Sequence, residues 1–418
     1  MSANSYSFAK NWLFGLANKS VPNERVTNET SSSWQRKSIL RPSLQLRWSL
    51  RWWGGMLLWL LLVLPAQAAV ELRVAIGQDQ DTLTIGSSTA AIIRNGSGEA
   101  LYQLPQLQGV SVESDTSDVD LVSSSGTILS ESNAFWLEPT DDGFVWIGDK
   151  WYRGRVQVTQ EGGQLLAINY VDLEDYLYSV VGSEMPTSWP QAALQSQAVA
   201  ARSYALYKRS RSKYPLYDLN ATTAYQVYKG IEQEHPNTIN AVDSTANQVV
   251  TYNGTVIEAI FHSSSGGGTE NASDVWSSDV PYLRSVQDFD QGSPVFSWNE
   301  TFTLTEFSSK IGGIGQVHTI GTAQLTPSGR VASITFAGEN GTKTLRGRDV
   351  RSALQLRSTR FVIDLNETTK TVTVTGSGFG HGVGMSQWGA RSLAEEGWDY
   401  ERILNHYYQS TAIAQLEF

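Results

Sequence analysis

Gly182-Ser183-Glu184-Met185-Pro186 separates two predicted helices of this 418-residue chain and places an acidic residue between them. The apolar neighbours Met185 and Pro186 leave the Glu184 carboxyl group poorly solvated. Poor solvation raises the pKa of a carboxyl group toward the range that a proton donor needs. A surface turn in which Glu184 points into water is the alternative interpretation, and the rest of the chain has to decide between the two.

Helix signals lie on both sides of this stretch. Residues 173–181 predict a short helix. On the other side, Ser188 is placed to cap a second helix, Pro190 fits its first turn, and Gln191 follows Ser188 at the spacing of a capping box. A mostly small apolar surface follows, which allows close packing. Arg202 interrupts that surface near its far end, where we expect a long polar side chain to reach a cleft.

Strand patterns dominate the chain before these helices. Residues 70–140 contain short alternating runs broken by glycine, serine and aspartate, which predict a small β-rich domain. Further strand patterns lie at residues 144–147, 151–158 and 165–170.

Beyond the helices, Asn253-Gly254 between two alternating runs predicts a β-hairpin. Residues 300–375 alternate strand patterns with short helices, and a glycine-rich loop at 376–384 leads into a helical region from Ser386 onward. The fold class that we predict is therefore α+β, with mixed sheets and a few helices around a cleft, and a small β-rich domain before them.

The N-terminal region has the pattern of a secretory signal. Arg41, Arg47 and Arg51 precede an apolar run over residues 52–64, and a small-x-small cleavage signature follows at 65–68. The run is short for a membrane span, which takes about 20 residues. We expect an exported protein of the periplasm, cell wall or extracellular space, and an uncleaved membrane anchor is the alternative.

The charge balance narrows the class of partner. Without residues 1–68 the chain carries 23 basic and 39 acidic residues, a net charge of −16. Nucleic-acid binding rests on neutralising phosphates, so this balance excludes DNA and RNA as partners. A carbohydrate or cell-wall substrate suits an exported protein of this charge better. The chain has no cysteine, which excludes disulfides and cysteine-ligated metal sites.

Several other chemistries have weaker signals. Ser264 and His262 are the pair that a serine hydrolase would use, but adjacency in sequence does not make a triad. No two of the five histidines have the i, i+4 spacing of a zinc-protease helix, so we predict no metal. His381 lies between two glycines, which let the backbone approach a ligand and leave the imidazole exposed. A tight loop with a hydrogen-bonding histidine is the alternative.

Taken together, the motifs resemble the stage II sporulation protein D (SpoIID) family from residue 143 to the C-terminus. They are ordered and dense, and those that carry the resemblance are Tyr152-Arg153-Gly154, residues 171–177, Glu184-Met185-Pro186, Ala200-Ala201-Arg202-Ser203-Tyr204, Gln226-Val227-Tyr228, Ser265-Gly266-Gly267, Pro281-Tyr282-Leu283, residues 380–387 and His406-Tyr407-Tyr408.

The resemblance implies a lytic transglycosylase acting on peptidoglycan glycan strands stripped of their stem peptides, without a cofactor. The family's catalytic acid maps onto Glu184. The substrate-binding residues that we expect around the glycan-binding cleft are Arg202, Ser264, Tyr282, His381 and Gln387. The domains implied are a tail with a signal or anchor over 1–68, a β-rich accessory domain over 69–142 and a SpoIID-like catalytic domain over 143–418.

The sequence departs from the family pattern in two places. Some members hold a metal with Cys and His just before the Gln-Val-Tyr motif, where this chain has Asn220, Ala224 and Tyr225, so we predict no such metal. Trp388 stands where a tyrosine is common, which keeps a stacking face and loses a hydroxyl. Two rival functions stay open: an amidase enhancer, whose partner is a cell-wall amidase, and a structural wall-binding protein.

Overall fold

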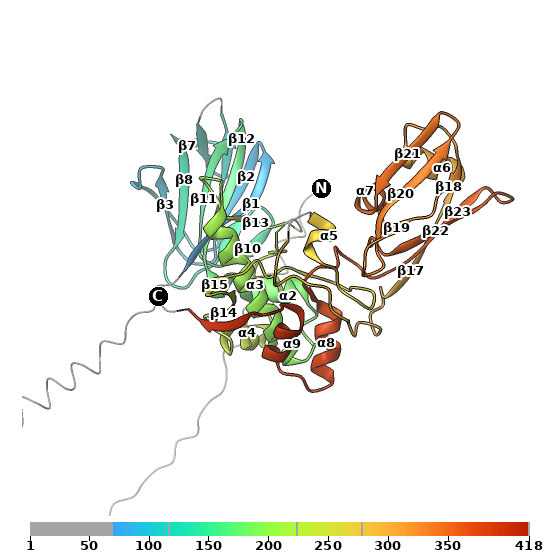
Figure 1. Cartoon of the computed structure of the whole chain (residues 1–418). Helices are drawn as coiled ribbons and strands as arrows, with labels where there is room; N and C mark the ends of the chain where they lie inside the picture. Colours follow the sequence, from blue (N-terminus) through green and yellow to red (C-terminus); the bar gives the residue numbers. More distant parts are fainter. Residues whose placement is uncertain (1–69, 116–117, 223–224, 277–278, 417–418) are drawn as a thin grey trace, which may run out of the picture. The chain divides into compact units, whose positions relative to one another are not determined.

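The computed structural model describes residues 70–115, 118–222, 225–276 and 279–416. In these residues it is an α+β fold with several sheets, of which the largest combines antiparallel pairs with one parallel pair, and eight α-helices, α2–α9 (Figure 1). None of the described helices is both long and apolar enough to span a membrane. The predicted signal or anchor over residues 1–68 lies outside the described residues.

Two large sheets are built from the first part of the described chain. The seven-stranded sheet has the order β13 (Leu219–Asn220), β1 (Glu71–Gln80), β12 (Gln164–Asp172), β11 (Arg155–Glu161), β8 (Ala134–Pro139), β3 (Ala91–Asn95) and β4 (Ala100–Leu104). The six-stranded sheet has the order β10 (Lys150–Tyr152), β9 (Val145–Ile147), β2 (Thr82–Ser87), β5 (Gly109–Ser114), β6 (Val119–Val122) and β7 (Ile128–Ser132).

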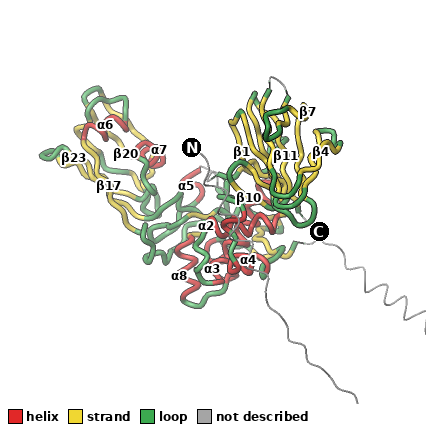
Figure 2. The backbone as a smooth tube through the Cα atoms, turned by 180° about the vertical axis from the view of Figure 1, so that it is seen from behind, coloured by secondary structure: helices red, strands yellow, loops and turns green. Residues whose placement is uncertain are grey.

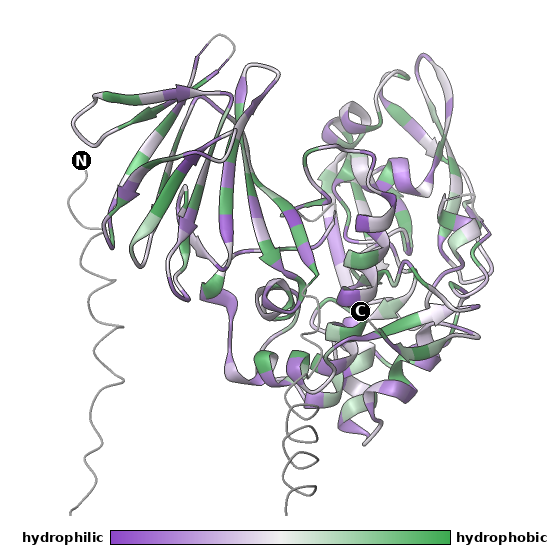
Figure 3. Ribbon diagram, turned by 90° about the vertical axis from the view of Figure 1, so that its left-hand side faces the viewer, coloured by the Kyte–Doolittle hydropathy of each residue, from purple (hydrophilic) through white to green (hydrophobic). Residues whose placement is uncertain are grey.

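Alternating side chains explain why these segments are strands. Figure 3 shows hydrophobic and hydrophilic residues alternating along them, as expected when one face of a strand is buried and the other is wet. The predicted domain boundary between residues 142 and 143 falls inside these sheets, because β8 on one side of it pairs with β11 on the other. The sequence does not reveal this pairing, because local patterns carry no information on which distant strands form hydrogen bonds with each other.

A group of helices follows the sheets and shares their core (Figure 2). It consists of α2 (Leu173–Glu184), α3 (Gln191–Arg211), η2 (Ile231–Gln233), α4 (Pro236–Asp243), α5 (Ala272–Trp276), α8 (Gln387–Glu395) and α9 (Tyr400–Tyr407). The Asp172 side chain caps α2 by accepting hydrogen bonds from two backbone N–H groups. The predicted cap of α3 is wrong: Pro190, not Ser188, is its N-cap residue, and no side chain bonds there.

The predicted hairpin at Asn253-Gly254 is confirmed. It joins β14 (Gln248–Tyr252) to β15 (Thr255–Val256), and both turn residues have positive φ angles, 50° and 74°. Strand β14 also pairs with β25 (Ala412–Gln415), a C-terminal strand that follows the predicted helical region. Further on, β16 (Phe261–His262) runs parallel to β24 (Met385–Ser386), which brings two loops that are distant in sequence together.

Between β16 and β24 the chain forms what we call the inserted lobe, residues 297–377. Its strands are β17 (Ser297–Thr303), β18 (Val317–Ile320), β19 (Gln324–Leu325), β20 (Val331–Gly338), β21 (Gly341–Arg346), β22 (Phe361–Asn366) and β23 (Thr371–Ser377), and its helices are α6 (Leu304–Ile311) and α7 (Gly347–Leu354). Phe307 and Phe336 are fully buried in a hydrophobic core that is separate from the core of the sheets and helices.

Candidate functional site

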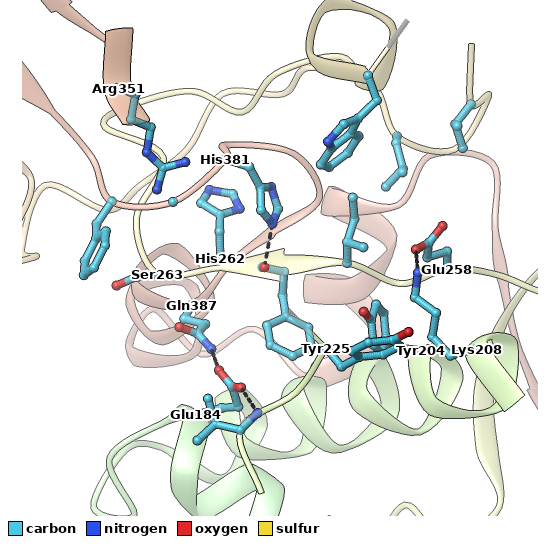
Figure 4. Close-up of a pocket in the computed structure, with 18 residues that line it drawn as sticks. Glu184, Tyr204, Lys208, Tyr225, Glu258, His262, Ser263, Arg351, His381 and Gln387 are labelled. Atoms are coloured by element: carbon cyan, nitrogen blue, oxygen red, sulfur yellow. Dashed lines mark hydrogen bonds and ion pairs between the residues drawn. The ribbon is translucent and has the colours of Figure 1, made fainter. Parts of the chain in front are cut away.

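A pocket with a volume of about 900 Å³ brings three of the predicted site residues together: Glu184, His381 and Gln387 (Figure 4). This volume is in the usual range for small-molecule sites. The predicted residues Arg202, Ser264 and Tyr282 are not among those that line it.

Glu184 is the last residue of α2, and its carboxylate accepts two hydrogen bonds. The backbone N–H of Val227 donates to Oε1 over 3.0 Å, and Nε2 of Gln387 donates to Oε2 over 3.2 Å. Burial raises the pKa of Glu184 above its ordinary value, although the two hydrogen bonds and the charge of Lys229 act in the opposite direction. The carboxyl group is therefore biased toward its protonated form.

The Gln-Val-Tyr motif fixes the Val227 N–H in place. Gln226 is buried, accepts a hydrogen bond from the Tyr176 hydroxyl over 3.3 Å and donates one to the Ala201 carbonyl over 3.3 Å. The Tyr228 hydroxyl donates to the Asn169 side chain over 2.9 Å. The two side chains that flank Val227 thus anchor the backbone, so its N–H points at the Glu184 carboxylate.

Gln387 is positioned in a similar way from the other side. It is the first residue of α8, whose N-terminus is capped by the Ser386 side chain. Its Nε2 lies 3.2 Å from Glu184 Oε2 and 3.4 Å from the Oε1 atom of Gln197, a buried residue of α3. Both neighbours are acceptors, so the amide is oriented with its NH₂ group toward the acid.

Arg202 does not reach the pocket, contrary to the prediction. Its guanidinium is 0% exposed and forms an ion pair with Glu174 of α2, with Nη2 and Oε2 2.6 Å apart. It also donates to the backbone carbonyls of Val242 and Gln248. The helix surface around Arg202 is therefore covered by α2, α4 and β14, and the side chain ties these elements together.

Ser264 and Tyr282 do not line the pocket either. The Ser264 hydroxyl donates to Asp290, a buried carboxylate that also accepts the backbone N–H groups of Gly266 and Gly267 over 2.8 Å each. The Tyr282 hydroxyl accepts the N–H of Glu258, and its ring lies against another tyrosine. Both residues hold loops in position, and no hydrogen bond in the described residues joins Ser264 to His262.

His381 contributes the face of its ring and not its nitrogens. The Val383 N–H donates to Nδ1 over 3.1 Å, so Nε2 carries the proton and donates to the Phe261 carbonyl over 3.0 Å. Burial lowers the pKa of His381 to about 4, which keeps the ring neutral. The expected exposed imidazole is thus a partly buried ring with both polar atoms already bonded.

The glycines around His381 make room for protein side chains. Gly380 has a φ of 120°, and a Cβ there would lie 2.7 Å from the Cβ of His262. Gly382 has a φ of 84°, and a Cβ there would lie 2.4 Å from the guanidinium carbon of Arg330. The glycine pattern predicts a close approach of the backbone to a ligand, but the groups that approach these glycines are the side chains of His262 and Arg330.

The sequence did not single out several pocket residues. Trp276 and Phe379 both line the pocket and are 43% and 45% exposed, which is unusual for large aromatic side chains. Trp276 also lies 5.3 Å from the His381 ring. Arg351 comes from α7 of the inserted lobe. Only the aromatic character of Trp276 and Phe379 beside polar loop residues was visible in sequence, and nothing marked Arg351.

No group of three or more histidine or acidic side chains in the described residues is arranged to hold a metal ion. Of the three positions that the resemblance associates with a metal, Asn220, Ala224 and Tyr225, Ala224 lies outside the described residues. Trp388 packs edge-on against Trp189, with ring centroids 4.8 Å apart, and does not line the pocket.

Comparison with known proteins identifies two regions. Residues 161–252 match the family described as stage II sporulation protein, and residues 281–384 match a domain of unknown function (DUF8618). The first region includes Glu184, whereas the second includes Arg351 and His381.

Three relatives extend over much of the chain. Stage II sporulation protein D of Bacillus subtilis is 39% identical over 271 residues, which are 60% of this chain and 77% of that protein. An uncharacterised protein of Brachyspira hyodysenteriae is 35% identical over 285 residues, 66% of this chain and 75% of the relative. The amidase enhancer of Bacillus subtilis is 30% identical over 292 residues, 57% of this chain and 40% of the enhancer. With this identity and coverage, the chain belongs to the stage II sporulation protein D family.

Proposed function

We propose that this chain is an exported lytic transglycosylase that cleaves peptidoglycan glycan strands and leaves 1,6-anhydromuramic acid ends. The observation that carries the proposal is a single available acid in the pocket. Glu184 has a raised pKa through burial, whereas the pocket's other carboxylate in the described residues, Glu258, is held in an ion pair with Lys208. Ordinary glycosidases use two carboxyl groups, but a reaction without a water nucleophile needs one.

Glu184 acts in both halves of the reaction. It donates its proton to the glycosidic oxygen as the bond between that oxygen and C1 of muramic acid breaks. The O6 hydroxyl of the same sugar then bonds to C1, and its proton passes to the Glu184 carboxylate. No water is consumed, and the enzyme ends in its starting protonation state. Between the steps, the Val227 N–H and the Gln387 amide stabilise the negative charge on Glu184.

Aromatic surfaces in the pocket suit a sugar substrate. The exposed rings of Trp276 and Phe379 and the ring face of His381 offer apolar surfaces of the kind that pack against pyranose rings. Of the binding residues expected from sequence, we assign direct contact to His381 and Gln387. Arg202, Ser264 and Tyr282 then act by holding the surrounding elements in place.

The test is digestion of purified denuded glycan by the mature protein, with products identified by mass. We expect anhydromuramic ends, and we expect Glu184→Gln to lower their formation by about 10²- to 10⁴-fold, the usual contribution of a general acid–base. Glu258→Gln is the matched control, since it changes the pocket's other carboxylate and should still give anhydro products. Reducing ends would show a hydrolase instead.

A second candidate follows from the similarity to the amidase enhancer. In that case the pocket binds glycan, Glu184 performs no chemistry, and the partner is a cell-wall amidase. The wild type would then give no glycan products. The wild-type protein would instead raise the rate of the amidase, and the Glu184→Gln variant would raise that rate by the same factor.

A further inference from the structure

A second pocket lies beside the strand that begins the described chain. It has a volume of about 780 Å³, and its lining comes from β1, from the end of α3 and from the hairpin of β14 and β15. Strands β13 and β15 both contact α3 (Figure 1). This pocket shares no lining residue with the pocket that contains Glu184. It is therefore a separate site, for which the reaction proposed above has no use.

The second pocket combines apolar and cationic side chains. Leu206, Val256 and Leu416 are partly buried and offer it apolar surface. Arg73 is 32% exposed and already in an ion pair, whereas Arg209 is exposed and has no ion-pair partner among the described residues. A pocket of this kind suits an amphipathic anion, because the charge of the anion meets the arginine while its apolar part covers the aliphatic side chains.

The end of α3 extends this positive charge beyond the pocket. Residues 208–217 contain four basic and no acidic residues, although residues 69–418 carry a net charge of −16. Arg209, Arg211 and Lys213, which we call the basic end of α3, are all exposed, and no described carboxylate pairs with them. The helix dipole favours cations in the last turn of α3, but Lys213 lies beyond the helix. Three free cations are thus left for a ligand.

An exposed aromatic ring follows the basic end of α3. Tyr214 is 52% exposed, and its ring stacks on that of the buried Tyr217 with the centroids 4.9 Å apart. The ring is therefore held in place while part of its apolar surface stays open to solvent. Exposed tyrosine next to lysine and arginine is typical of protein surfaces at a membrane interface, where the ring lies at the level of the lipid headgroups.

The place of the second pocket along the chain also favours a membrane. The apolar run over residues 52–64, which predicts a signal or an uncleaved anchor, ends six residues before Val70. Six extended residues cover at most about 20 Å. Val70 directly precedes Glu71 and Arg73, which line the pocket. A retained anchor therefore brings the pocket and the basic end of α3 close to the membrane surface.

We propose that the second pocket and the basic end of α3 form a binding surface for anionic phospholipids. The three free cations pair with the phosphate groups, and the aliphatic lining of the pocket and the Tyr214 ring contact the apolar part of the lipid. The net negative charge of the chain does not prevent this, because charges more than about 8 Å away are largely screened at physiological ionic strength. The inference goes beyond the proposed function and does not depend on it.

The test takes advantage of a chain without cysteine. In the full 418-residue chain, Ser210→Cys is labelled with a dye whose emission reports contact with lipid, since Ser210 is exposed and lines the second pocket. Vesicles consist of phosphatidylcholine alone or of an equal mixture with phosphatidylglycerol. We expect lipid contact on the mixed vesicles only, and we expect added salt to weaken it.

A second label position separates contact at this surface from insertion of the N-terminal region. The same dye at Ser352→Cys, an exposed position on α7 of the inserted lobe, should stay in water on both kinds of vesicle. If both labels entered lipid on both kinds of vesicle, the N-terminal region alone would explain the signal and the inference would be wrong.

The charges are tested by changing all three residues of the basic end of α3 to glutamine. Each lysine or arginine near an anionic surface contributes about a fivefold factor, so the ratio of lipid-contacting to free label should fall by about 10²-fold. The matched control is Lys310→Gln/Arg346→Gln/Lys370→Gln, which removes three cations from the inserted lobe and should leave the ratio unchanged. Tyr214→Ser should lower the ratio but keep its salt dependence, because it removes apolar contact and no charge.

Three results would overturn the inference: equal contact on both kinds of vesicle, contact that salt does not change, or equal contact with and without the basic end of α3. If inorganic polyphosphate changed the emission at residue 210 and vesicles did not, the surface would bind a soluble phosphate polymer instead of lipid. Cleavage of soluble denuded glycan should be the same with and without the three charges, so the inference and the proposed function fail separately.

Discussion

The two ends of the pocket are packed in different ways. Glu184 ends α2, which shares one hydrophobic core with the two large sheets and α3. Arg351 lies on α7, which belongs to the separate core of the inserted lobe. Among the described residues, the acid is thus held by the larger of these two cores, whereas the cation depends on the smaller one. The difference predicts that mutations in one core leave the packing at the other end of the pocket unchanged.

The largest effect that we expect is on the acid's side. Glu174→Gln leaves the fully buried Arg202 guanidinium without its ion-pair partner, and an uncompensated buried charge typically costs about 3–5 kcal/mol. Urea unfolding measures this loss. The double variant Glu174→Gln/Arg202→Met should recover much of the stability, because both charges are then absent. If the double variant, which lacks the guanidinium, were as stable as wild type but bound glycan more weakly, Arg202 would be a substrate ligand after all.

A slightly smaller effect is expected in the inserted lobe. Leu354→Ala removes a buried side chain from α7 and should destabilise the lobe by about 2–5 kcal/mol. Hydrogen exchange should then accelerate within residues 297–377 and remain slow in α2 and α3, since the cores are separate. The exposed Ser352→Ala, on the same helix, is the control. If hydrogen exchange accelerated equally in α2, the two cores would unfold as one cooperative unit, and the contrast between the two ends of the pocket would not hold.

A third experiment concerns the proton on Glu184. Gln387→Leu removes one hydrogen bond to the ionised carboxylate, worth about 1.5–3 kcal/mol, and so raises the pKa of Glu184 by about one unit or more. The reaction starts from protonated Glu184, so the fall in kcat at alkaline pH should move to higher pH. The exposed Gln164→Leu on β12 should leave the profile in place. A shift to lower pH would contradict the assigned orientation of the amide.

The smallest effect that we expect is the pH-dependent contribution of Glu184 to the free energy of unfolding. Because the folded protein holds the Glu184 proton more tightly than the unfolded chain, ionising this group costs stability as pH rises through its folded pKa. Glu184→Gln should therefore be more stable than wild type at neutral pH, which urea unfolding of the two proteins measures. The difference should vanish below the ordinary carboxyl pKa. If the wild-type protein were more stable than Glu184→Gln at neutral pH, the Glu184 carboxylate would not be poorly solvated.

Local features of the fold followed well from the sequence. The α+β class, the helix before Glu184 and the hairpin at Asn253-Gly254 depend on periodicity and turn chemistry over a few residues, and the structure confirms them. The predicted cap at Ser188 failed because Pro190 takes the N-cap position without a side-chain bond. The pairing of β8 with β11 across residue 142 was not visible in the sequence, because it joins distant strands.

Within the site, the sequence identified residue types better than their surroundings. Glu184 and Gln387, which the motifs assign to the site, both line the pocket, and the structure adds a hydrogen bond between them that the sequence did not predict. Arg202 was misplaced because a helix pattern shows which face is apolar but not which element covers it. Arg351 was missed because it lies in a lobe without recognisable motifs, and the fold alone brings it to the pocket.

The sequence by itself determined that Glu184 is an acid at a helix end, beside apolar neighbours, in a chain with the motifs of one family. Only the tertiary structure decided that this acid faces an arginine across one pocket, with Glu258 neutralised by Lys208. The physical reason is the range of the interactions. Capping, periodicity and turns act over a few residues, whereas desolvation and ion pairing depend on which distant segments pack together.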